Sequence, residues 1–375
     1  MSSTRCLTLA AGSLTILLAA NATLTIAVAQ PAVPSAANTK ADDSGTMRRA
    51  NTEMRRVLMK LGQLGAKPLG TQSVEVTRKG PTPADAVMTL LRDDGKDPVA
   101  MIGKLNVGKQ DFTYPAGSGA QPLRVYTPDR QSGRPLPVIV YYHGGGWVIA
   151  TIDTYESSAM ALAKKTGAIV VSVEYRHAPE NRFPSAHDDA IAAYKWVSQN
   201  AGQFGGDPGR LAVAGESAGG NLAINVAIMA RDQNVAKPLH MLLVYPVAGV
   251  NMNTPSYRAN EYAVPLSKAA MEWFVKNTIA NPSDVNDPRL DLTGKANLAG
   301  LPPATVIGAE IDPLASEGKM LADKLRAAGV KTTYREYKGV THEFFGMNAV
   351  VSDAENAQKL GAKELRTALF RDLTR

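Results

Sequence analysis

From residue 123 onwards the chain alternates short apolar runs with amphipathic segments, and this alternation restricts its fold more than any other feature. The apolar runs have the length and composition of buried strands, and they cover residues 123–126, 138–142, 168–174, 211–214, 241–245, 304–308 and 332–337. The amphipathic segments are predicted helices, at residues 155–165, 188–201, 219–231, 268–277, 317–328 and 354–370. Alternating strands and helices predict an α/β fold in which helices cover both faces of a mainly parallel sheet.

A long connection rich in Asn and Pro, residues 251–301, interrupts this alternation. In an α/β unit such an insertion commonly forms a lid or cap over an active site. Two further helices are predicted ahead of the sheet, at residues 46–64 and 83–92, from the spacing of their apolar residues. We therefore expect residues 46–107 to supply N-terminal cap helices and residues 108–375 to form the main, catalytic domain that carries the insertion.

Residues 1–29 have the features of a signal peptide. Arg5 is followed by no Lys, Arg, Asp or Glu until Lys40, and the apolar stretch ends in Ala27-Val28-Ala29, the small-x-small pattern of a cleavage site. An uncleaved membrane anchor is the alternative, because the stretch is long enough to span a bilayer, but polar residues interrupt it. The sequence thus predicts export after cleavage near Ala29, with residues 30–45 as a flexible mature N-terminus.

Cleavage at this point removes Cys6, the only cysteine of the chain. The mature protein is then predicted to have no disulfide, no cysteine nucleophile and no thiolate metal site. The formal charge of +7 comes from Lys and Arg residues spread along the sequence, which argues against a nucleic-acid partner. For residues 46–64 we prefer a helix packed on the protein to one on a membrane surface, because its apolar stripe has no aromatic residue. We expect no stable membrane insertion of the mature form.

The sharpest local signal is Gly215-Glu216-Ser217-Ala218-Gly219, which lies between a predicted strand and a predicted helix. A G-x-S-x-G sequence in this setting makes a tight turn that exposes the serine hydroxyl above the sheet. The glycines are needed because side chains on either side of the turn would collide where the strand reverses into the helix. The helix dipole also stabilises negative charge at Ser217. The motif predicts a nucleophilic serine.

A second motif, His143-Gly144-Gly145-Gly146-Trp147, follows another apolar run. Consecutive glycines let backbone N–H groups turn inward together. Two such groups, with the amide that follows the serine, would hold the oxyanion of a tetrahedral intermediate. A plain glycine-rich turn is the alternative. We expect His143 to hold the loop rather than to transfer protons.

A nucleophilic serine needs a base, and the base needs an orienting carboxylate. Among the five histidines, His342 lies in a short predicted loop just after the last apolar run. Asp312 follows the apolar run before it, with Glu310 as a rival carboxylate. Ser217, Asp312 and His342 occur in the chain order of α/β hydrolases. Since parallel strands end at one edge of their sheet, the three side chains can meet above that edge.

Five motifs stand in the order found in one family: residues 143–147, 175–180 with Phe183-Pro184, 215–220, 312–314 and 342–346. On these motifs the chain resembles the hormone-sensitive-lipase-like bacterial esterases, family IV of the α/β-hydrolase superfamily, from about residue 138 to residue 347. The resemblance implies an α/β-hydrolase fold with about eight strands and a helical cap. It implies hydrolysis of short- to medium-chain carboxylic esters through an acyl-serine, with a small-molecule ester as partner and no metal or organic cofactor. It leaves a homodimer open, because many relatives dimerise.

Carried over residue by residue, the resemblance makes Ser217 the nucleophile, His342 the general base and then acid, and Asp312 the orienting carboxylate. Its oxyanion hole corresponds to the backbone of two glycines and of the residue after the serine, with one more glycine shaping the turn: Gly145, Gly146, Ala218 and Gly144. The motif 175–180 would be scaffolding, and we expect its Glu180 to tie loops together rather than to act as a catalytic acid.

Three residues depart from the family pattern: Glu216, His177 and Glu343 stand where Asp, Leu and Gly are usual. None belongs to the triad, so the departures put the substrate range in doubt rather than the activity. The resemblance also implies that the N-terminal helices and the insertion form a cap over the substrate pocket. Five aromatic residues are candidates for lining this pocket: Tyr257, Tyr262, Trp273, Phe274 and, beside the glycine loop, Trp147.

Two other functions stay open at this point. An amidase or peptidase could use the same triad, since the motifs do not distinguish the leaving group. A noncatalytic ligand-binding relative would keep the fold without the chemistry. A metal-dependent hydrolase is disfavoured, because the sequence has no H-E-x-x-H and its cluster His187-Asp188-Asp189 heads a helix, where carboxylates complement the dipole.

Overall fold

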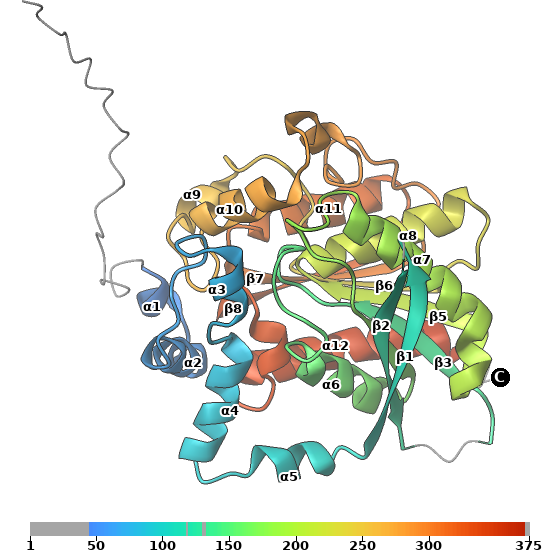
Figure 1. Cartoon of the computed structure of the whole chain (residues 1–375), viewed down its shortest axis with the longest axis horizontal. Helices are drawn as coiled ribbons and strands as arrows, with labels where there is room; N and C mark the ends of the chain where they lie inside the picture. The colour runs from blue at the N-terminus through green and yellow to red at the C-terminus, as the bar shows by residue number, and fades with distance from the viewer. Residues whose placement is uncertain (1–44, 118, 130–132, 372–375) are drawn as a thin grey trace, which may run out of the picture. The chain divides into compact units, whose positions relative to one another are not determined.

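A single eight-stranded sheet organises the computed structural model, which describes residues 45–117, 119–129 and 133–371 (Figure 1). The strand order is β1-β2-β4-β3-β5-β6-β7-β8. The strands are β1 (Val107–Ala116), β2 (Gly119–Pro128), β3 (Leu136–Tyr142), β4 (Ile169–Val173), β5 (Gly206–Glu216), β6 (Met241–Val244), β7 (Ala304–Ile311) and β8 (Thr332–Thr341). From β4 to β8 all neighbours are parallel, whereas β2 pairs antiparallel with both β1 and β4. The predicted mainly parallel sheet is therefore confirmed.

Helices cover both faces of this sheet, as predicted. Side chains alternate across the pleat: Val138 and Val140 of β3 join one apolar core, and Ile139 and Tyr141 join the other. The first core is shared with α7 (Ser185–Asn200), α8 (Ala218–Asp232) and α11 (Ala315–Ala327), and the second with α6 (Glu156–Thr166) and α12 (Ser352–Leu369). Burial on both faces is why the parallel strands are apolar along their length.

The sequence prediction missed β1, which forms a hairpin with β2 at the edge of the sheet. Lys109, Gln110 and Asp111 make its first half polar and exposed, so the strand has no apolar run to reveal it. The predicted helix 46–64 is two helices, α1 (Thr46–Arg49) and α2 (Thr52–Gln63), because the side chain of Asn51 accepts a hydrogen bond from the amide of Met54 and caps α2.

The apolar stripe of α2 packs on the protein. Met54, Val57, Leu58 and Leu61 are buried in the core that α6 and α12 share, and the hydroxyl of Thr341 lies 3.5 Å from the sulfur of Met54. No helix among the described residues is both long and apolar enough to cross a membrane. The predicted signal peptide, residues 1–29, and nearly all of the predicted flexible segment 30–45 lie outside the described residues.

The N-terminal helices and the insertion both approach the loops at the carboxyl edge of the sheet. The remaining helices of these two segments are α3 (Val74–Arg78), α4 (Pro83–Asp93) and α5 (Pro98–Gly103), then α9 (Pro255–Ala259), α10 (Lys268–Thr278) and the 3₁₀ helix η2 (Pro282–Asn286). Arg49 donates to the side chain of Asn260, 2.7 Å away. Arg78 donates to the carbonyl of Val148, just after the glycine loop, at 2.8 Å.

The buried carboxyl of Glu317 in α11 offers a test of the fold. One of its oxygens accepts hydrogen bonds from the amides of Ala248 and Gly249, at 2.7 and 3.3 Å. Burial raises the pKa of Glu317 from 4.5 to about 8, so the folded protein holds this proton more tightly than the unfolded chain does. The group therefore favours folding most below pH 4.5, and that contribution is lost as pH rises towards 8.

We expect Glu317→Gln to remove this pH dependence, because the amide oxygen can still accept both bonds and carries no charge. The difference in Tm between variant and native protein should shift in favour of the variant between pH 5 and pH 8 in calorimetry. Glu272→Gln, which changes an exposed carboxyl, serves as the control. A Tm difference that is constant over this range would contradict the prediction.

Candidate active site

Ser217 occupies a strained turn between β5 and α8. Its backbone has φ 56° and ψ −120°, a conformation that costs a non-glycine residue about 1–3 kcal/mol. A Cβ atom on Gly215 would overlap the backbone of Gly219, and one on Gly219 would overlap the carbonyl of Tyr142 in β3. Only glycines therefore allow α8 to start so close to the sheet, and this start points the serine side chain away from the strand.

The fold brings Ser217, Asp312 and His342 into one hydrogen-bonded chain. The Oγ of Ser217 lies 2.9 Å from Nε2 of His342, and Nδ1 of His342 lies 2.6 Å from Oδ2 of Asp312. The other oxygen of Asp312 accepts from the amide of Leu314 at 2.8 Å. All three groups are buried and follow the ends of β5, β7 and β8. This order of donor and acceptor atoms can take a proton from the serine and return it to a leaving group.

The glycine loop after β3 lies beside this chain of hydrogen bonds. Gly145 and Gly146 have φ 92° and 58°, which turns their amides away from the ordinary strand direction. The hydroxyl of Tyr175 donates to the carbonyls of His143 and Gly144, both at 3.0 Å, and holds the turn. Among the described residues, no acceptor takes up the amides of Gly145, Gly146 and Ala218, so these N–H groups can bind an anionic oxygen.

Comparison with known proteins agrees with this geometry. Residues 139–346 match the family described as alpha/beta hydrolase fold. The carboxylesterase NlhH of Mycobacterium tuberculosis is 38% identical over 282 residues, which cover 73% of this chain and 86% of that protein. The chain belongs to the hormone-sensitive-lipase-like branch of the alpha/beta hydrolases.

Two relatives from Pseudomonas putida extend the comparison. An ethyl acetate hydrolase is 33% identical over 250 residues, 66% of this chain and 79% of that protein. The crystal structure of a thermostable esterase from strain ECU1011 superposes with a TM-score of 0.76 at 31% identity, covering 86% of this chain and 98% of the other. The predicted α/β-hydrolase fold is thus confirmed for this hydrolase.

Two acids lie beside the triad of the hydrolase: Glu216 is buried, and Glu343 is partly buried. Glu216 accepts hydrogen bonds from the hydroxyls of Tyr141, at 2.6 Å, and of Tyr245. Burial, with a contribution from the nearby Glu343, raises the pKa of Glu216 to about 7. Burial likewise raises the pKa of Glu343, whose oxygens both lie 2.7 Å from the hydroxyl of Tyr155. Three tyrosine hydroxyls therefore stabilise two acids that lie next to the serine and histidine.

These tyrosines were missed by the sequence analysis, although two of them end predicted strands. Tyr141 and Tyr245 stand at the carboxyl ends of their apolar runs, where side chains face a functional edge. Nothing in the sequence shows that both hydroxyls converge on Glu216. The ring of Tyr245 also packs on His342, with centroids 4.4 Å apart, and so helps to fix the imidazole.

Glu343 also acts on His342 through its charge. One of its oxygens lies 3.7 Å from Nε2 of His342. Burial lowers the pKa of His342, because it disfavours the charged imidazole. The charge and hydrogen bond of Asp312 raise this pKa, and the charge of Glu343 raises it further. The net result is a pKa of His342 above its ordinary 6.5. The negative charges therefore favour the imidazolium form, which His342 would reach if it took the proton of Ser217.

The remaining predicted site residues lie around the triad rather than in it. His143 is buried and stacks on the ring of Tyr175, with centroids 4.4 Å apart. Trp147 is buried in the core, its ring 5.8 Å from that of His187. Glu180 pairs with Arg78 through two hydrogen bonds of 2.8 Å, and this guanidinium lowers the pKa of Glu180 to about 2. Glu180 thus ties α3 to the loop after β4.

The rival carboxylate Glu310 does not face His342. Its side chain accepts from the amide of Gly339, 2.8 Å away, and so joins β7 to β8.

The predicted pocket residues of the insertion differ in their exposure and contacts: Tyr257 is buried in the core, Tyr262 is 71% exposed, Trp273 is half-buried, and Phe274 packs against Gly146. Thr278 also donates to the carbonyl of Gly146, at 3.2 Å, so α10 braces the glycine loop.

Glu343→Gln should move the acidic limb of the activity profile to lower pH. His342 must be neutral to accept the serine proton, and removing the neighbouring negative charge lowers its pKa. We expect the native profile of kcat/KM, which reports the free enzyme, to rise with a midpoint above pH 6.5. The kcat/KM of the variant should rise with a midpoint at lower pH than that of the native protein.

The control for this measurement is Glu180→Gln, which removes a carboxyl that contacts no triad residue. It should leave the midpoint in place. A Glu343→Gln limb at the native position, or at higher pH, would show that Glu343 does not set the basicity of His342.

Proposed function

We propose that this protein is a carboxylesterase that hydrolyses its substrate through an acyl intermediate on Ser217. The observation that carries the proposal is the continuous hydrogen-bonded chain from Ser217 through His342 to Asp312, with separations of 2.9 and 2.6 Å. The carboxylesterase and the ethyl acetate hydrolase among its relatives support ester hydrolysis as the reaction.

In the acylation step, Ser217 attacks the carbonyl carbon of the ester while Nε2 of His342 takes the hydroxyl proton. Asp312 accepts the Nδ1–H of the imidazole, which keeps Nε2 free as a base and stabilises the imidazolium that forms. His342 then gives the proton to the departing alcohol, and the acyl group remains on Ser217. The same histidine activates a water molecule that hydrolyses the acyl-serine.

The oxyanion of each tetrahedral intermediate is proposed to bind the amides of Gly145, Gly146 and Ala218. Three fixed donors cost no reorganisation when charge develops, and removal of one such donor typically costs about 10²–10³-fold in rate. Gly144 shapes the turn that aims them. Phe274 and Thr278 of α10 hold this loop from the other side, which supports the proposal that residues 251–301 act as a cap together with residues 46–107.

We propose short- to medium-chain acyl esters as the substrates. The relative named for ethyl acetate supports a small acyl group. Burial of Ser217 and His342, which are 5% and 3% exposed, favours substrates that enter a confined space beneath a cap. The departures at Glu216, His177 and Glu343 distinguish this chain within its family and leave the preferred acyl length to measurement.

Ser217→Ala is expected to abolish hydrolysis of p-nitrophenyl acetate and butyrate, with a fall in kcat of about 10⁴-fold or more, because the variant has no nucleophile. Release of p-nitrophenol measures the rate, and a series of longer acyl chains measures the acyl preference. Ser172→Ala is a matched control, since Ser172 of β4 has a buried hydroxyl that finds no hydrogen-bond partner within the described part of the chain. It should keep the native rate.

Three outcomes would contradict the proposal. Equal rates for the native protein and Ser217→Ala would exclude the acyl-serine. Faster cleavage of an anilide than of the ester with the same acyl group would assign the triad to an amidase. A native protein inert on every ester and anilide would point instead to a noncatalytic binding role.

We also propose that the protein is exported after cleavage of residues 1–29. The uncharged apolar stretch before Ala27-Val28-Ala29 supports this. N-terminal sequencing of the protein from the fraction outside the inner membrane should begin at Gln30, and an intact N-terminus in the membrane fraction would indicate an anchor instead. Light scattering of the same sample tests the homodimer that the family resemblance leaves open.

A further inference from the structure

Three potential metal ligands meet beside the glycine loop, outside the triad. Nε2 of His143 lies 3.4 Å from Oε1 of Glu174, and Nε2 of His177 lies 3.3 Å from the same oxygen. All three atoms are within 4.8 Å of one another. His143 follows β3, while Glu174 and His177 follow the neighbouring parallel strand β4, so the sheet brings the two loops together.

A hydrogen bond decides which nitrogen of the neutral His143 ring carries the hydrogen. Its Nδ1 lies 2.8 Å from the carbonyl oxygen of Gly144, which can only accept, so Nδ1 carries the hydrogen. In a neutral ring the lone pair of Nε2 then faces the carboxylate oxygen of Glu174. Among the described residues, neither this Nε2 nor that of His177 has a hydrogen-bond partner, and His143 is fully buried. Electron-rich atoms that face each other in this way need a proton or a cation between them.

The two separations from the Glu174 oxygen match the edges of a tetrahedral metal site. With metal–nitrogen and metal–oxygen bonds of about 2.0–2.1 Å, ligand atoms in a tetrahedron lie about 3.3 Å apart. Both contacts of the Glu174 oxygen, at 3.3 and 3.4 Å, have this value. A hydrogen-bonded ion pair without a metal would be shorter, at about 2.7–2.9 Å.

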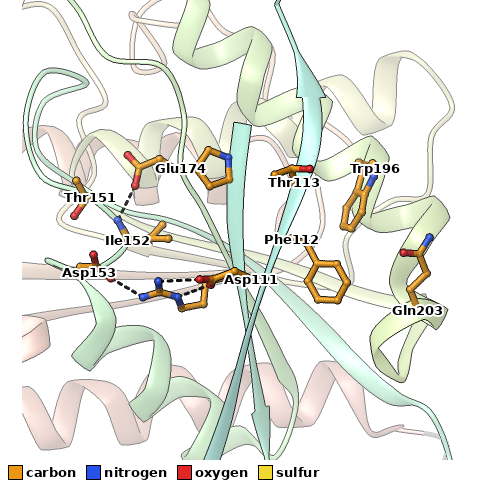
Figure 2. Close-up of a pocket in the computed structure, with 11 residues that line it drawn as sticks. Asp111, Phe112, Thr113, Thr151, Ile152, Asp153, Glu174, Trp196 and Gln203 are labelled. Atoms are coloured by element: carbon orange, nitrogen blue, oxygen red, sulfur yellow. Dashed lines mark hydrogen bonds and ion pairs between the residues drawn. The ribbon is translucent and has the colours of Figure 1, made fainter. Parts of the chain in front are cut away.

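The surrounding groups hold the ligands in place. The second oxygen of Glu174 accepts from the amide of Ile152 at 2.9 Å (Figure 2). This bond leaves Oε1 for the two imidazoles. The Nδ1–H of His143 donates to a backbone carbonyl, as metal-binding histidines commonly do, and its ring stacks on Tyr175. The nearby positive charge of Arg78 is paired with Glu180.

We propose that His143, Glu174 and His177 bind a divalent transition-metal ion, with Zn²⁺ as the best match to two imidazoles and one carboxylate. The fourth position faces outward, because Glu174 and His177 are each 16% exposed in their side chains. Glu174 also lines an open groove of about 760 Å³ with Thr151 and Ile152, and this groove offers a route of entry (Figure 2).

The ion would tie the start of the glycine loop to the end of β4. The site contains no triad residue, so the ion has a structural role and takes no part in ester cleavage. The sequence alone predicts no metal ligand here, because His143 and Glu174 are distant in the chain and His177 stands out only as a departure from the family pattern. The proposal does not depend on the proposed function, because its readouts are metal content and stability.

The test uses the full chain without a histidine tag, stripped of metal with EDTA and titrated with Zn²⁺. We expect one Zn²⁺ per chain by calorimetry and by elemental analysis, and a Tm that rises with Zn²⁺ concentration. Co²⁺ in place of Zn²⁺ should give the visible absorption of a tetrahedral site.

His177→Leu and Glu174→Gln should each weaken Zn²⁺ binding by about 100-fold or more, because each removes a ligand. His177→Leu should still unfold in one cooperative transition in calorimetry, which shows that it folds. Asp153→Asn, which changes another carboxylate of the same groove, should bind Zn²⁺ like the native protein.

Two results would overturn the proposal. In the first, the native protein takes up no stoichiometric metal and its Tm does not respond to Zn²⁺, which would leave a protonated His143 beside Glu174. In the second, Glu174→Gln and a folded His177→Leu both bind Zn²⁺ as the native protein does, which would place the ion elsewhere.

Discussion

The close approach of α8 to the sheet is the constraint on which the site depends. Gly215 and Gly219 leave no room for a side chain between the helix and β3 or β5, and this contact forces Ser217 into a backbone conformation with positive φ. The strain is sustained by the buried core on both sides of the turn. Because the serine is fixed by backbone, the imidazole of His342 meets a hydroxyl whose position is already set.

The pKa values of the acids and of the histidine at the site depend on burial as well as on the contacts within the triad. Asp312, Glu216 and Glu343 are acids placed within one buried region, and tyrosine hydroxyls satisfy the last two. Their combined negative charge favours a charged His342, which is the state that the proposed attack of the serine would require. The cost of burying the acids appears as their raised pKa values, so the same groups couple the basicity of the histidine to pH.

The glycine loop is the point where distant parts of the chain converge. Tyr175 holds its carbonyls, α10 presses Phe274 and Thr278 against Gly146, and Arg78 of α3 reaches the carbonyl of Val148 just beyond it. The loop's own backbone hydrogen bonds run from the amides of Val148 and Ile149 to the carbonyl of Gly145, and they leave the glycine amides free. Contacts from elements before and after the sheet add to these bonds and hold the loop from outside.

The sequence by itself determined the alternating α/β architecture, the strand-turn-helix around Ser217 and the order of Ser217, Asp312 and His342. The spacing of apolar residues, the positions of glycines and the order of motifs can all be read along the chain without knowing which residues meet in space. It did not reveal β1, whose polar half carries no periodicity. Only the tertiary structure decided that tyrosines from three elements meet Glu216 and Glu343, that Glu310 bonds the backbone instead of His342, and that two histidines close on Glu174. Such contacts join residues far apart in the chain, and the register of neighbouring strands, which no local pattern encodes, sets their distances.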